Sequence, residues 1–265
     1  MIPKIVFIIP YRNREHHKTF FLRYIKYILE DYNKNDYEIV FSHQKDTRPF
    51  NRGAVKNIGF KFIKKKYPND YKNINFVFHD IDVMPSTKGL LDYETTQGII
   101  KHYYGFNYAL GGIISIKGSD FELINGYPNY WSWSLEDNCL QKRAEKNKIN
   151  IDRSNFFNIG DHHILHIHDG VYKDYSETNL ELFKTETGNE GLETIYKLII
   201  EDKNITDDVI NHTFCDIINF DTLYSHIEQL PIEKHNLKDG NNLNTKNKQT
   251  RRFNSRITTL MYHNK

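Results

Sequence analysis

Residues 75–82, NFVFHDID, are the stretch from which the fold can be read. The segment 75–78 is a short apolar run, which is typical of a strand buried on both faces of a sheet. It leads within two residues to Asp80 and Asp82, two carboxylates separated by one residue. In sheets of parallel strands, ligands bind at the carboxyl ends of the strands. The stretch therefore predicts a buried strand that delivers two acidic side chains to a ligand site.

Further strand patterns lie on both sides of this stretch, and helical patterns alternate with them. We predict strands at 4–10 (KIVFIIP), 37–42 (YEIVFS) and 108–117, and helices at 20–29, 51–62 and 137–147. This alternation indicates an α/β layered fold with a largely parallel sheet. Pro10, Tyr11 and Arg12 then lie at a strand end, where they can share one cleft with Asp80 and Asp82.

The chain of 265 residues is long enough for one large domain with a buried core. We assign residues 1–236 to that domain and 237–265 to a polar C-terminal tail, within which 237–252 is expected to be a loop or disordered. The net charge of +2 gives no reason to expect a nucleic-acid partner. The two cysteines, Cys139 and Cys215, lie too far apart in sequence to suggest a disulfide framework. Without a signal peptide or a bilayer-spanning apolar run, the chain is expected to be soluble and cytoplasmic, with no membrane anchor of its own.

The triplet Asp80-Ile81-Asp82 is the first candidate for chemistry. Two carboxylates on an irregular strand end can hold a divalent cation that also binds a diphosphate. Oxygen ligands suit Mn²⁺ and Mg²⁺, and such a cation offsets the charge of a leaving nucleoside diphosphate. Such triplets also arise often by chance, so a pair of solvated loop carboxylates is the alternative interpretation.

A run of histidines is the second candidate: His162, His163, His166 and His168. His166 and His168 flank a single residue, so on an extended segment both imidazoles point to one side and can supply two nitrogen ligands. Asp169 can orient one of these rings as an outer partner. Core or surface histidines without a ligand are the alternative.

Residues 130–137, YWSWSLED, hold both tryptophans directly before two adjacent carboxylates. A tryptophan face can pack on a sugar ring. A carboxylate at a helix start stays ionised and can accept a proton from a hydroxyl group. The alternative is a tryptophan-rich core loop followed by capping acids.

Two segments, 11–14 (YRNR) and 50–52 (FNR), combine arginines with aromatic residues. Arginines at a strand end suit a phosphate or the edge of a uracil ring, and aromatic side chains suit base stacking. Arginines beside a sheet otherwise form surface salt bridges, so neither segment is decisive in isolation.

Taken together and in order, these segments resemble the β-1,4-galactosyltransferase family, inverting enzymes with a GT-A fold. The matching stretches are 7–15 (FIIPYRNRE), 50–60 (FNRGAVKNIGF), 76–85 (FVFHDIDVMP), 111–116 (GGIISI) and 124–137 (INGYPNYWSWSLED). The element 166–168 and residues 191–196 look like the xylosylprotein galactosyltransferase branch of that family. The resemblance covers about residues 5–221 and implies a GT-A nucleotide-sugar-binding fold, in which a mostly parallel central sheet is flanked by helices.

The resemblance also implies an activity and a set of residue roles. The activity is Mn²⁺-dependent transfer, with Mg²⁺ as the other candidate ion, of a hexose or N-acetylhexosamine from a UDP-sugar to a hydroxyl of a glycan or glycoside acceptor. Galactose is the first choice of sugar, and the new linkage is β. Asp137 matches the catalytic base and Glu136 a substrate contact beside it, while the metal ligands are Asp82, His166 and His168. The positions implied to bind the donor are Pro10, Tyr11, Arg12, Arg14, Phe50, Arg52, Asp80, Ile81, Gly112 and Trp133, the last on a mobile loop that closes over the donor.

The chain departs from the family pattern at several positions. Ser132 and Ser134 replace glycines, which predicts a stiffer loop. Asn138 stands where a further acid is common. Ala109 aligns with an aromatic residue, usually Tyr, of the galactose-using enzymes, and Tyr108 is one place away. The smaller side chain leaves space for a 2-acetamido group, so UDP-GalNAc or UDP-GlcNAc is a candidate donor besides UDP-galactose.

Two other function classes compete with a transferase. A metal hydrolase built on the histidines would cleave substrate without an acceptor, but it leaves the segments 11–14 and 130–137 unexplained. A non-catalytic sugar- or nucleotide-binding module on a degenerate transferase fold is favoured by Ser132 and Ser134. The retained Asp137 argues against it, because a binding module has no use for a base.

Overall fold

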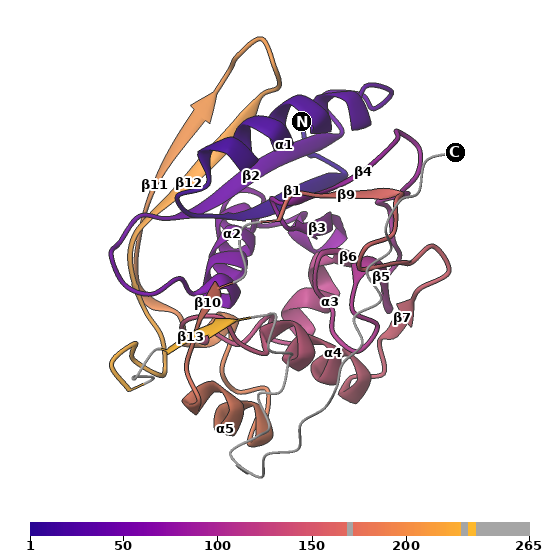
Figure 1. The fold of residues 1–265 in the computed structure, drawn as a ribbon. Helices are drawn as coiled ribbons and strands as arrows, with labels where there is room; N and C mark the ends of the chain where they lie inside the picture. Colours follow the sequence, from indigo (N-terminus) through magenta and orange to yellow (C-terminus); the bar gives the residue numbers. More distant parts are fainter. Residues whose placement is uncertain (169–171, 229–232, 237–265) are drawn as a thin grey trace, which may run out of the picture.

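Strand β3 (Asn75–His79) lies inside the main sheet, as its apolar sequence requires. The computed structural model describes residues 1–168, 172–228 and 233–236. Among these residues, nine strands form the main sheet in the order β11-β12-β2-β1-β3-β6-β5-β7, with β8 paired to β5 (Figure 1). The other bounds are β1 (Ile5–Tyr11), β2 (Tyr37–Gln44), β5 (Ile99–Gly105), β6 (Ile113–Lys117), β7 (Asn150–Asp152), β8 (Phe157–Asn158), β11 (Tyr196–Ile205) and β12 (His212–Asp221).

Two smaller ribbons and several helices complete the structure. β4 (Val83–Pro85) pairs with β9 (Ile164–His166), and β10 (Tyr172–Tyr175) pairs with β13 (Glu233–Asn236). The α-helices are α1 (Glu15–Ile28), α2 (Arg52–Lys66), α3 (Gly118–Leu123), α4 (Glu136–Lys146) and α5 (Thr178–Lys184), and two 3₁₀ turns are η1 (Tyr71–Asn73) and η2 (Leu192–Thr194). None of the helices in the described segments has both the length and the apolar composition that crossing a membrane would require.

The centre of the sheet is parallel, as the alternation of strands and helices predicts. β12, β2, β1 and β3 run parallel side by side, and β6 then pairs antiparallel with β3. Ile5 of β1 lies opposite both Tyr37 of β2 and Asn75 of β3. The carboxyl ends of β1 and β3 therefore meet at the same edge of the sheet, which is the edge where the site is expected.

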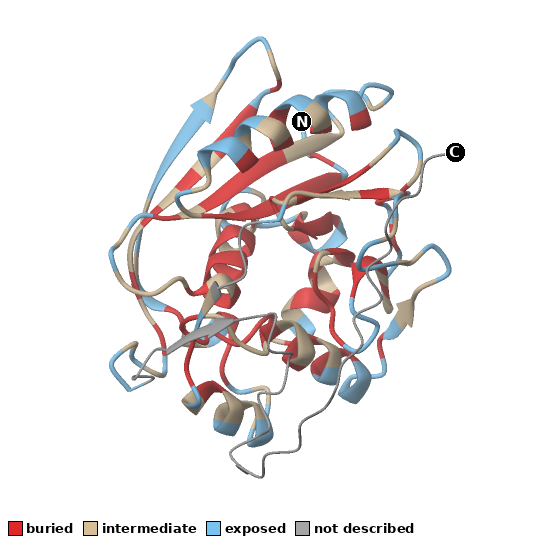
Figure 2. Ribbon diagram, in the orientation of Figure 1, coloured by how far each residue is buried: buried red, intermediate tan, exposed pale blue. Residues whose placement is uncertain are grey.

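Each face of the sheet is covered by a helix, and β1 shows how. Val6 and Ile8 belong to one core cluster together with Val55 and Ile58 of α2. The alternate residues of β1, Ile5, Phe7 and Ile9, belong to a second core cluster. That cluster also contains Phe21 and Ile25 of α1. This alternation follows from the two-residue period of a strand. Figure 2 shows the result, with the central strands buried and the outer side of α1 exposed.

Several element boundaries differ from those expected from the sequence. Helix α1 begins at Glu15, five residues before the predicted start at Phe20. The predicted strand 108–117 begins only at Ile113, because Gly112 has a left-handed φ of +68° that ends an extended run. The strands β5, β11 and β12 lie outside the segments predicted as strands. The predicted polar tail, 237–265, lies outside the described residues.

Candidate active site

The carboxyl ends of β1 and β3 bring two of the predicted segments into contact. Arg14 lies directly before α1, and its Nη1 is 3.3 Å from Oδ2 of Asp82. Both side chains are largely buried, with 27% of Arg14 and 19% of Asp82 exposed. The arginine-rich turn after β1 and the acidic turn after β3 therefore form one site, as parallel neighbouring strands require.

A short ribbon joins Asp82 to the histidine segment. Val83 of β4 pairs with His166 of β9, and the N–H of Ile167 donates to the carbonyl of Asp82 at 2.7 Å. This register places Nε2 of His166 3.9 Å from Oδ2 of Asp82. The exposed ring of His168 lies beside that of His166, with 4.2 Å between their centroids. The ladder thus places His166 beside Asp82, and His168 beside His166, while Asp169 lies outside the described residues.

The chemistry of these three side chains suits a divalent transition metal, although in the described residues their ligand atoms do not all lie within 4.8 Å of one another. One carboxylate and two imidazoles are a donor set that Mn²⁺ accepts. The hydroxyl of Tyr104 lies 3.0 Å from Nδ1 of His166, which leaves Nε2 on the side of Asp82. Burial lowers the pKa of His166, which favours the neutral ring that a metal needs. For Nε2 to bind a metal, Nδ1–H of His166 must donate to the hydroxyl oxygen of Tyr104, which is the kind of hydrogen bond that orients a ligating histidine.

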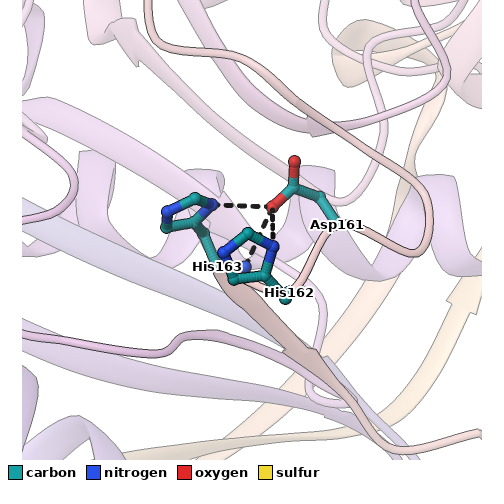
Figure 3. Close-up of side chains that lie close together, drawn as sticks. All are labelled: Asp161, His162 and His163. Atoms are coloured by element: carbon teal, nitrogen blue, oxygen red, sulfur yellow. Dashed lines mark hydrogen bonds and ion pairs between the residues drawn. The ribbon is translucent and has the colours of Figure 1, made fainter.

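The two upstream histidines form a separate group with Asp161 (Figure 3). Oδ1 of Asp161 is 2.8 Å from Nδ1 of His163 and 3.8 Å from Nδ1 of His162. In the part of the chain that the structure describes, these residues form a group of three potential ligands within 4.8 Å of one another. The same Oδ1 accepts the backbone N–H of His163 at 2.9 Å, and 86% of the His162 side chain is exposed. These contacts are those of a side-chain-capped turn before β9, so we assign the group a role in the turn.

A second cluster forms around Arg52 at the start of α2. Its Nη2 donates to both carboxylate oxygens of Asp80 at 2.6 Å each. Its Nη1 donates to Oε1 of Glu136 and to Oδ2 of Asp137, both at 2.7 Å. Glu136 and Asp137 occupy the first turn of α4, where the helix dipole favours negative charge. One guanidinium therefore links the acidic turn after β3 to the predicted base.

In this cluster, the pKa of Asp80 is lowered and the pKa of Glu136 is raised. Burial opposes ionisation of Asp80, but Arg52 and Lys56 outweigh it and lower the pKa of Asp80 to about 2. Burial raises the pKa of Glu136, and the charge of Arg52 only partly offsets that effect. Asp80 is therefore firmly ionised, whereas Glu136 holds a proton more readily than an exposed glutamate does.

The glycine pair before β6 allows the predicted base to lie close to the backbone. A Cβ atom on Gly111 would lie 2.5 Å from Oδ2 of Asp137, so a larger residue there would displace the carboxylate. A Cβ atom on Gly112 would lie 2.2 Å from the carbonyl oxygen of Tyr104. The carbonyl of Gly112 accepts the N–H of Asp80 at 2.9 Å. Gly112 thus shapes the site through its backbone.

The two tryptophans have different environments. Trp131 is 1% exposed, stacks on Phe220 with 5.2 Å between ring centroids, and donates from Nε1 to the carbonyl of Tyr224 at 3.0 Å. For Trp131 the core interpretation is therefore right. Trp133 is partly exposed, and its N–H donates to the carbonyl of Asp174 at 2.7 Å. Only Trp133 of the two is placed to meet a ligand.

The other predicted donor residues lie around the ends of β1, β3 and α2. Pro10 and Ile81 are buried. Tyr11 is 2% exposed, packs against Phe41 at 5.9 Å between ring centroids, and donates its hydroxyl to Glu15. Arg12 donates to the carbonyl of Arg48, and Phe50 is partly buried against the core cluster that contains α2. Tyr11 and Ile81 therefore serve packing first.

Sequence reasoning missed three residues of the site: Lys56, His102 and Tyr104. Lys56 follows Arg52 by one helical turn, and this i, i+4 spacing would have placed it on the same face. His102 lies in β5, where its Nε2 is 3.1 Å from the carbonyl oxygens of both Tyr104 and Gly111. No sequence pattern indicated that His102 and Tyr104 belong to the site, because β5 was not predicted as a strand.

Two family models and several known proteins match the sequence of the chain. The family described as the N-terminal region of glycosyl transferase group 7 matches residues 2–92, and the one described as the N-terminal domain of galactosyltransferase matches 98–169. β-1,4-Galactosyltransferase 4 of Cricetulus griseus is 31% identical over 163 residues, 58% of this chain and 46% of that protein. β-1,4-Galactosyltransferase 1 of Bos taurus is 32% identical over 161 residues, 57% of this chain and 39% of that protein. The chain thus spans less than half the length of these curated relatives.

The fold itself is shared with a solved structure. The catalytic domain of Drosophila β-1,4-galactosyltransferase 7, in complex with xylobiose, superposes with a TM-score of 0.69 at 21% identity, over 86% of this chain and 98% of that one. A variant of the same protein, in complex with manganese, UDP-Gal and xylobiose, gives a TM-score of 0.70 at 20% identity, again over 86% and 98% of the two chains. The shared fold is of the GT-A type. The two adjoining family matches, together with the curated relatives, show that the chain belongs to the β-1,4-galactosyltransferase family.

Proposed function

We propose that the chain is an inverting glycosyltransferase that moves a hexose or N-acetylhexosamine from a UDP-sugar to a hydroxyl group of a sugar acceptor. One observation carries the proposal. The carboxylate of Asp137 and the Asp82–His166 pair lie at the same edge of the sheet, and Arg52 links Asp137 to Asp80, two residues before Asp82. A base beside a candidate metal and diphosphate site is the arrangement that sugar transfer needs.

The reaction is a single displacement in which the chain's own groups handle the proton and the phosphate charge. Asp137 accepts the proton of the acceptor hydroxyl while that oxygen attacks the anomeric carbon. The bond between this carbon and the diphosphate oxygen breaks on the opposite face, which inverts the configuration and releases UDP. Arg14 and Arg52 are the cations nearest to Asp82 and Asp80 and are the proposed diphosphate contacts.

Asp82, His166 and His168 are the proposed holders of Mn²⁺, which when bound offsets negative charge on the leaving diphosphate. Trp133 lies on the segment directly before Glu136 and Asp137, and it is the proposed cover of the donor. Closing this segment would exclude water, so that transfer to the acceptor competes successfully with hydrolysis.

The identity of the donor sugar depends on the loop before Gly111. Ala109 is 6% exposed, whereas Tyr108 is 53% exposed and stacks on Phe106 with 5.2 Å between ring centroids. A methyl group at position 109 leaves room for a 2-acetamido substituent that an aromatic ring would fill. We therefore propose UDP-GalNAc or UDP-GlcNAc as donors besides UDP-galactose. Ala109→Tyr should shift turnover toward UDP-galactose, and turnover by the wild type with UDP-galactose alone would contradict the idea.

The acceptor is proposed as a glycan or glycoside. The Drosophila relative binds xylobiose, which makes β-xylosides the first acceptors to test. The chain matches less than half the length of its curated relatives. The acceptors of those relatives therefore serve only to choose the first compounds of an acceptor panel.

Calorimetric titration with UDP, with and without Mn²⁺, tests whether the site is of the transferase type. We expect Mn²⁺ to tighten UDP binding at least about tenfold, because an ion held by Asp82, His166 and His168 would offset the negative charge of the diphosphate. Equal binding with and without Mn²⁺ would contradict the proposal. Turnover of the UDP-sugar separates the two alternatives. A metal hydrolase would consume the UDP-sugar at a rate that does not depend on the acceptor, whereas a binding module would not consume it.

A further inference from the structure

Lys56 is a buried lysine at the centre of the site. It lies in α2 one turn after Arg52, and only 2% of its side chain is exposed. Lysine is rarely buried to this extent unless an acid is paired with it, because removing an ammonium group from water costs several kcal/mol. Its presence therefore needs a partner, and the structure supplies one that matters for the proposed chemistry.

That partner is the proposed base. Nζ of Lys56 lies 3.1 Å from Oδ1 of Asp137, while Arg52 contacts the other oxygen, Oδ2, at 2.7 Å. Nζ also lies 4.3 Å from the ring centroid of Tyr127, a favourable place for a cation. The ammonium group of Lys56 is thus held by the carboxylate of Asp137 and by the ring of Tyr127.

The two oxygens of Asp137 have different surroundings as a result. Oδ1 meets the buried ammonium group of Lys56. Oδ2 lies where Gly111 has no side chain, since a Cβ there would come within 2.5 Å of it. The groups that act on this carboxylate and on Lys56 come from several elements: Arg52 on α2, Asp80 after β3, His102 in β5, Tyr127 before α4 and Glu136 on α4.

Arg52 and Lys56 are not equivalent partners. Arg52 divides its hydrogen bonds among three carboxylates and is a proposed contact of the donor diphosphate. When Arg52 turns toward phosphate oxygens, Asp137 loses that contact. Lys56 is buried and has Asp137 as its carboxylate within salt-bridge distance, so it can hold the base throughout the reaction.

We propose that Lys56 is a positioning residue that fixes Oδ1 of Asp137, so that Oδ2 faces the acceptor hydroxyl as the proton-accepting atom. This inference rests on the proposed function, because it assumes that Asp137 is the base.

The test compares Lys56→Met, which keeps the length and removes the charge, with Lys56→Arg, which keeps the charge. The kcat and the acceptor KM of acceptor-dependent UDP release are measured, and the Kd for UDP with Mn²⁺ is measured alongside. In Lys56→Met we expect kcat to fall at least about tenfold while the acceptor KM stays within about twofold of the wild-type value, because a base whose Oδ1 is no longer fixed is misplaced for proton transfer but not for binding. The Kd for UDP should stay within about twofold of the wild-type value, since Lys56 is not a proposed donor contact.

Lys56→Arg keeps the cation beside Oδ1 and should recover part of the kcat lost in Lys56→Met. This rescue keeps the inference testable if Lys56→Met folds poorly. Lys61→Met is the matched control, because Lys61 lies on the same helix and donates to the carbonyl of Leu192 at 3.0 Å, away from Asp137. A wild-type kcat in Lys56→Met, or a kcat in Lys56→Arg as low as in Lys56→Met, would overturn the inference while leaving the transferase intact. Absence of acceptor-dependent turnover in the wild type would instead overturn the proposed function.

Discussion

Arg52 connects candidate segments that are far apart in the sequence into one site. The acidic triplet 80–82, the segment 50–52 and the acids after Trp133 are far apart along the chain. In the folded chain, a single guanidinium donates to Asp80, Glu136 and Asp137. Residue chemistry predicted the acids and the arginine, but it could not predict that they share one partner. That depends on the register of β1 and β3 and on the start of α4.

The acid dependence of stability should reveal the bond between Asp80 and Arg52. The folded-state pKa of Asp80, about 2, lies below its ordinary value of 3.8. A lowered carboxylate pKa stabilises the fold above the ordinary pKa, and this contribution, about 2 kcal/mol, is lost as the pH falls from about 4 to about 2.

Urea unfolding of the wild type and of Asp80→Asn across this pH range measures the effect. The difference in unfolding free energy between the two proteins should be largest above about pH 5 and should shrink by about 2 kcal/mol toward pH 2. A difference that is constant with pH would show that Arg52 does not hold Asp80 ionised.

Metal binding should distinguish two histidine groups only a few residues apart. His168→Ala removes a proposed ligand, so the Mn²⁺-dependent gain in UDP affinity should fall at least about tenfold. His163→Ala is the matched control, because His163 contacts Asp161 in the turn before β9. Calorimetry of UDP with Mn²⁺ checks both variants. A larger loss in His163→Ala than in His168→Ala would move the metal to the group around Asp161.

At the scale of elements, the loop before α4 is where local preference and structure disagree. Ser132 has a φ of +70°, a left-handed conformation that favours glycine. Its hydroxyl oxygen is buried without a hydrogen-bond partner among the residues described. The resemblance had marked position 132 as a place where glycine is usual, and the positive φ gives a physical reason for that preference, while the stiffer loop stays a prediction. The serine is held in this conformation by a hydrogen bond from its N–H to the carbonyl of Phe50 at 3.0 Å.

Replacing this serine should stabilise the protein. Ser132→Gly removes the left-handed strain and the unsatisfied hydroxyl, while glycine adds freedom to the unfolded chain. The net expected gain is about 1 kcal/mol in the free energy of unfolding. Ser134→Gly is the control, because Ser134 has no positive φ and its Oγ lies 3.3 Å from Oε2 of Glu136. Denaturant unfolding should show a gain for position 132 and a loss for position 134, and equal effects would contradict this account of the loop.

Other elements show which boundaries a sequence can predict. The strand β3 and the helix α2 match their apolar patterns, and the side chain of Asn51 caps α2 by accepting the N–H of Ala54 at 2.9 Å. The prediction of a strand at 108–117 was wrong over 108–112. The apolar composition of this segment gives no indication of the positive φ of Gly112, which ends the extended backbone. Apolar composition predicts burial well, but the direction of the chain at a glycine depends on tertiary contacts.

For the whole molecule, alternation of strands and helices was enough to predict an α/β layered fold with a parallel centre. It did not predict that β6 pairs antiparallel with β3, or that β11 pairs antiparallel with β12 at the edge of the sheet. The residues 196–205 of β11 are mostly exposed, so they lack the apolar run by which the inner strands were found. The order of motifs along the chain predicted the family, whereas the site contacts needed the folded structure.

Acceptor-stimulated release of UDP tests the central claim most directly. The wild type and Asp137→Asn are each incubated with Mn²⁺ and a panel of UDP-sugars, with and without β-xylosides and β-glucosides. We predict that one donor gives release that rises with acceptor, and that Asp137→Asn loses this release by at least about a hundredfold while still binding UDP, because only the proton acceptor is removed. A fully active Asp137→Asn would show that another group is the base. A wild type that neither turns over any UDP-sugar nor binds UDP would contradict the transferase account.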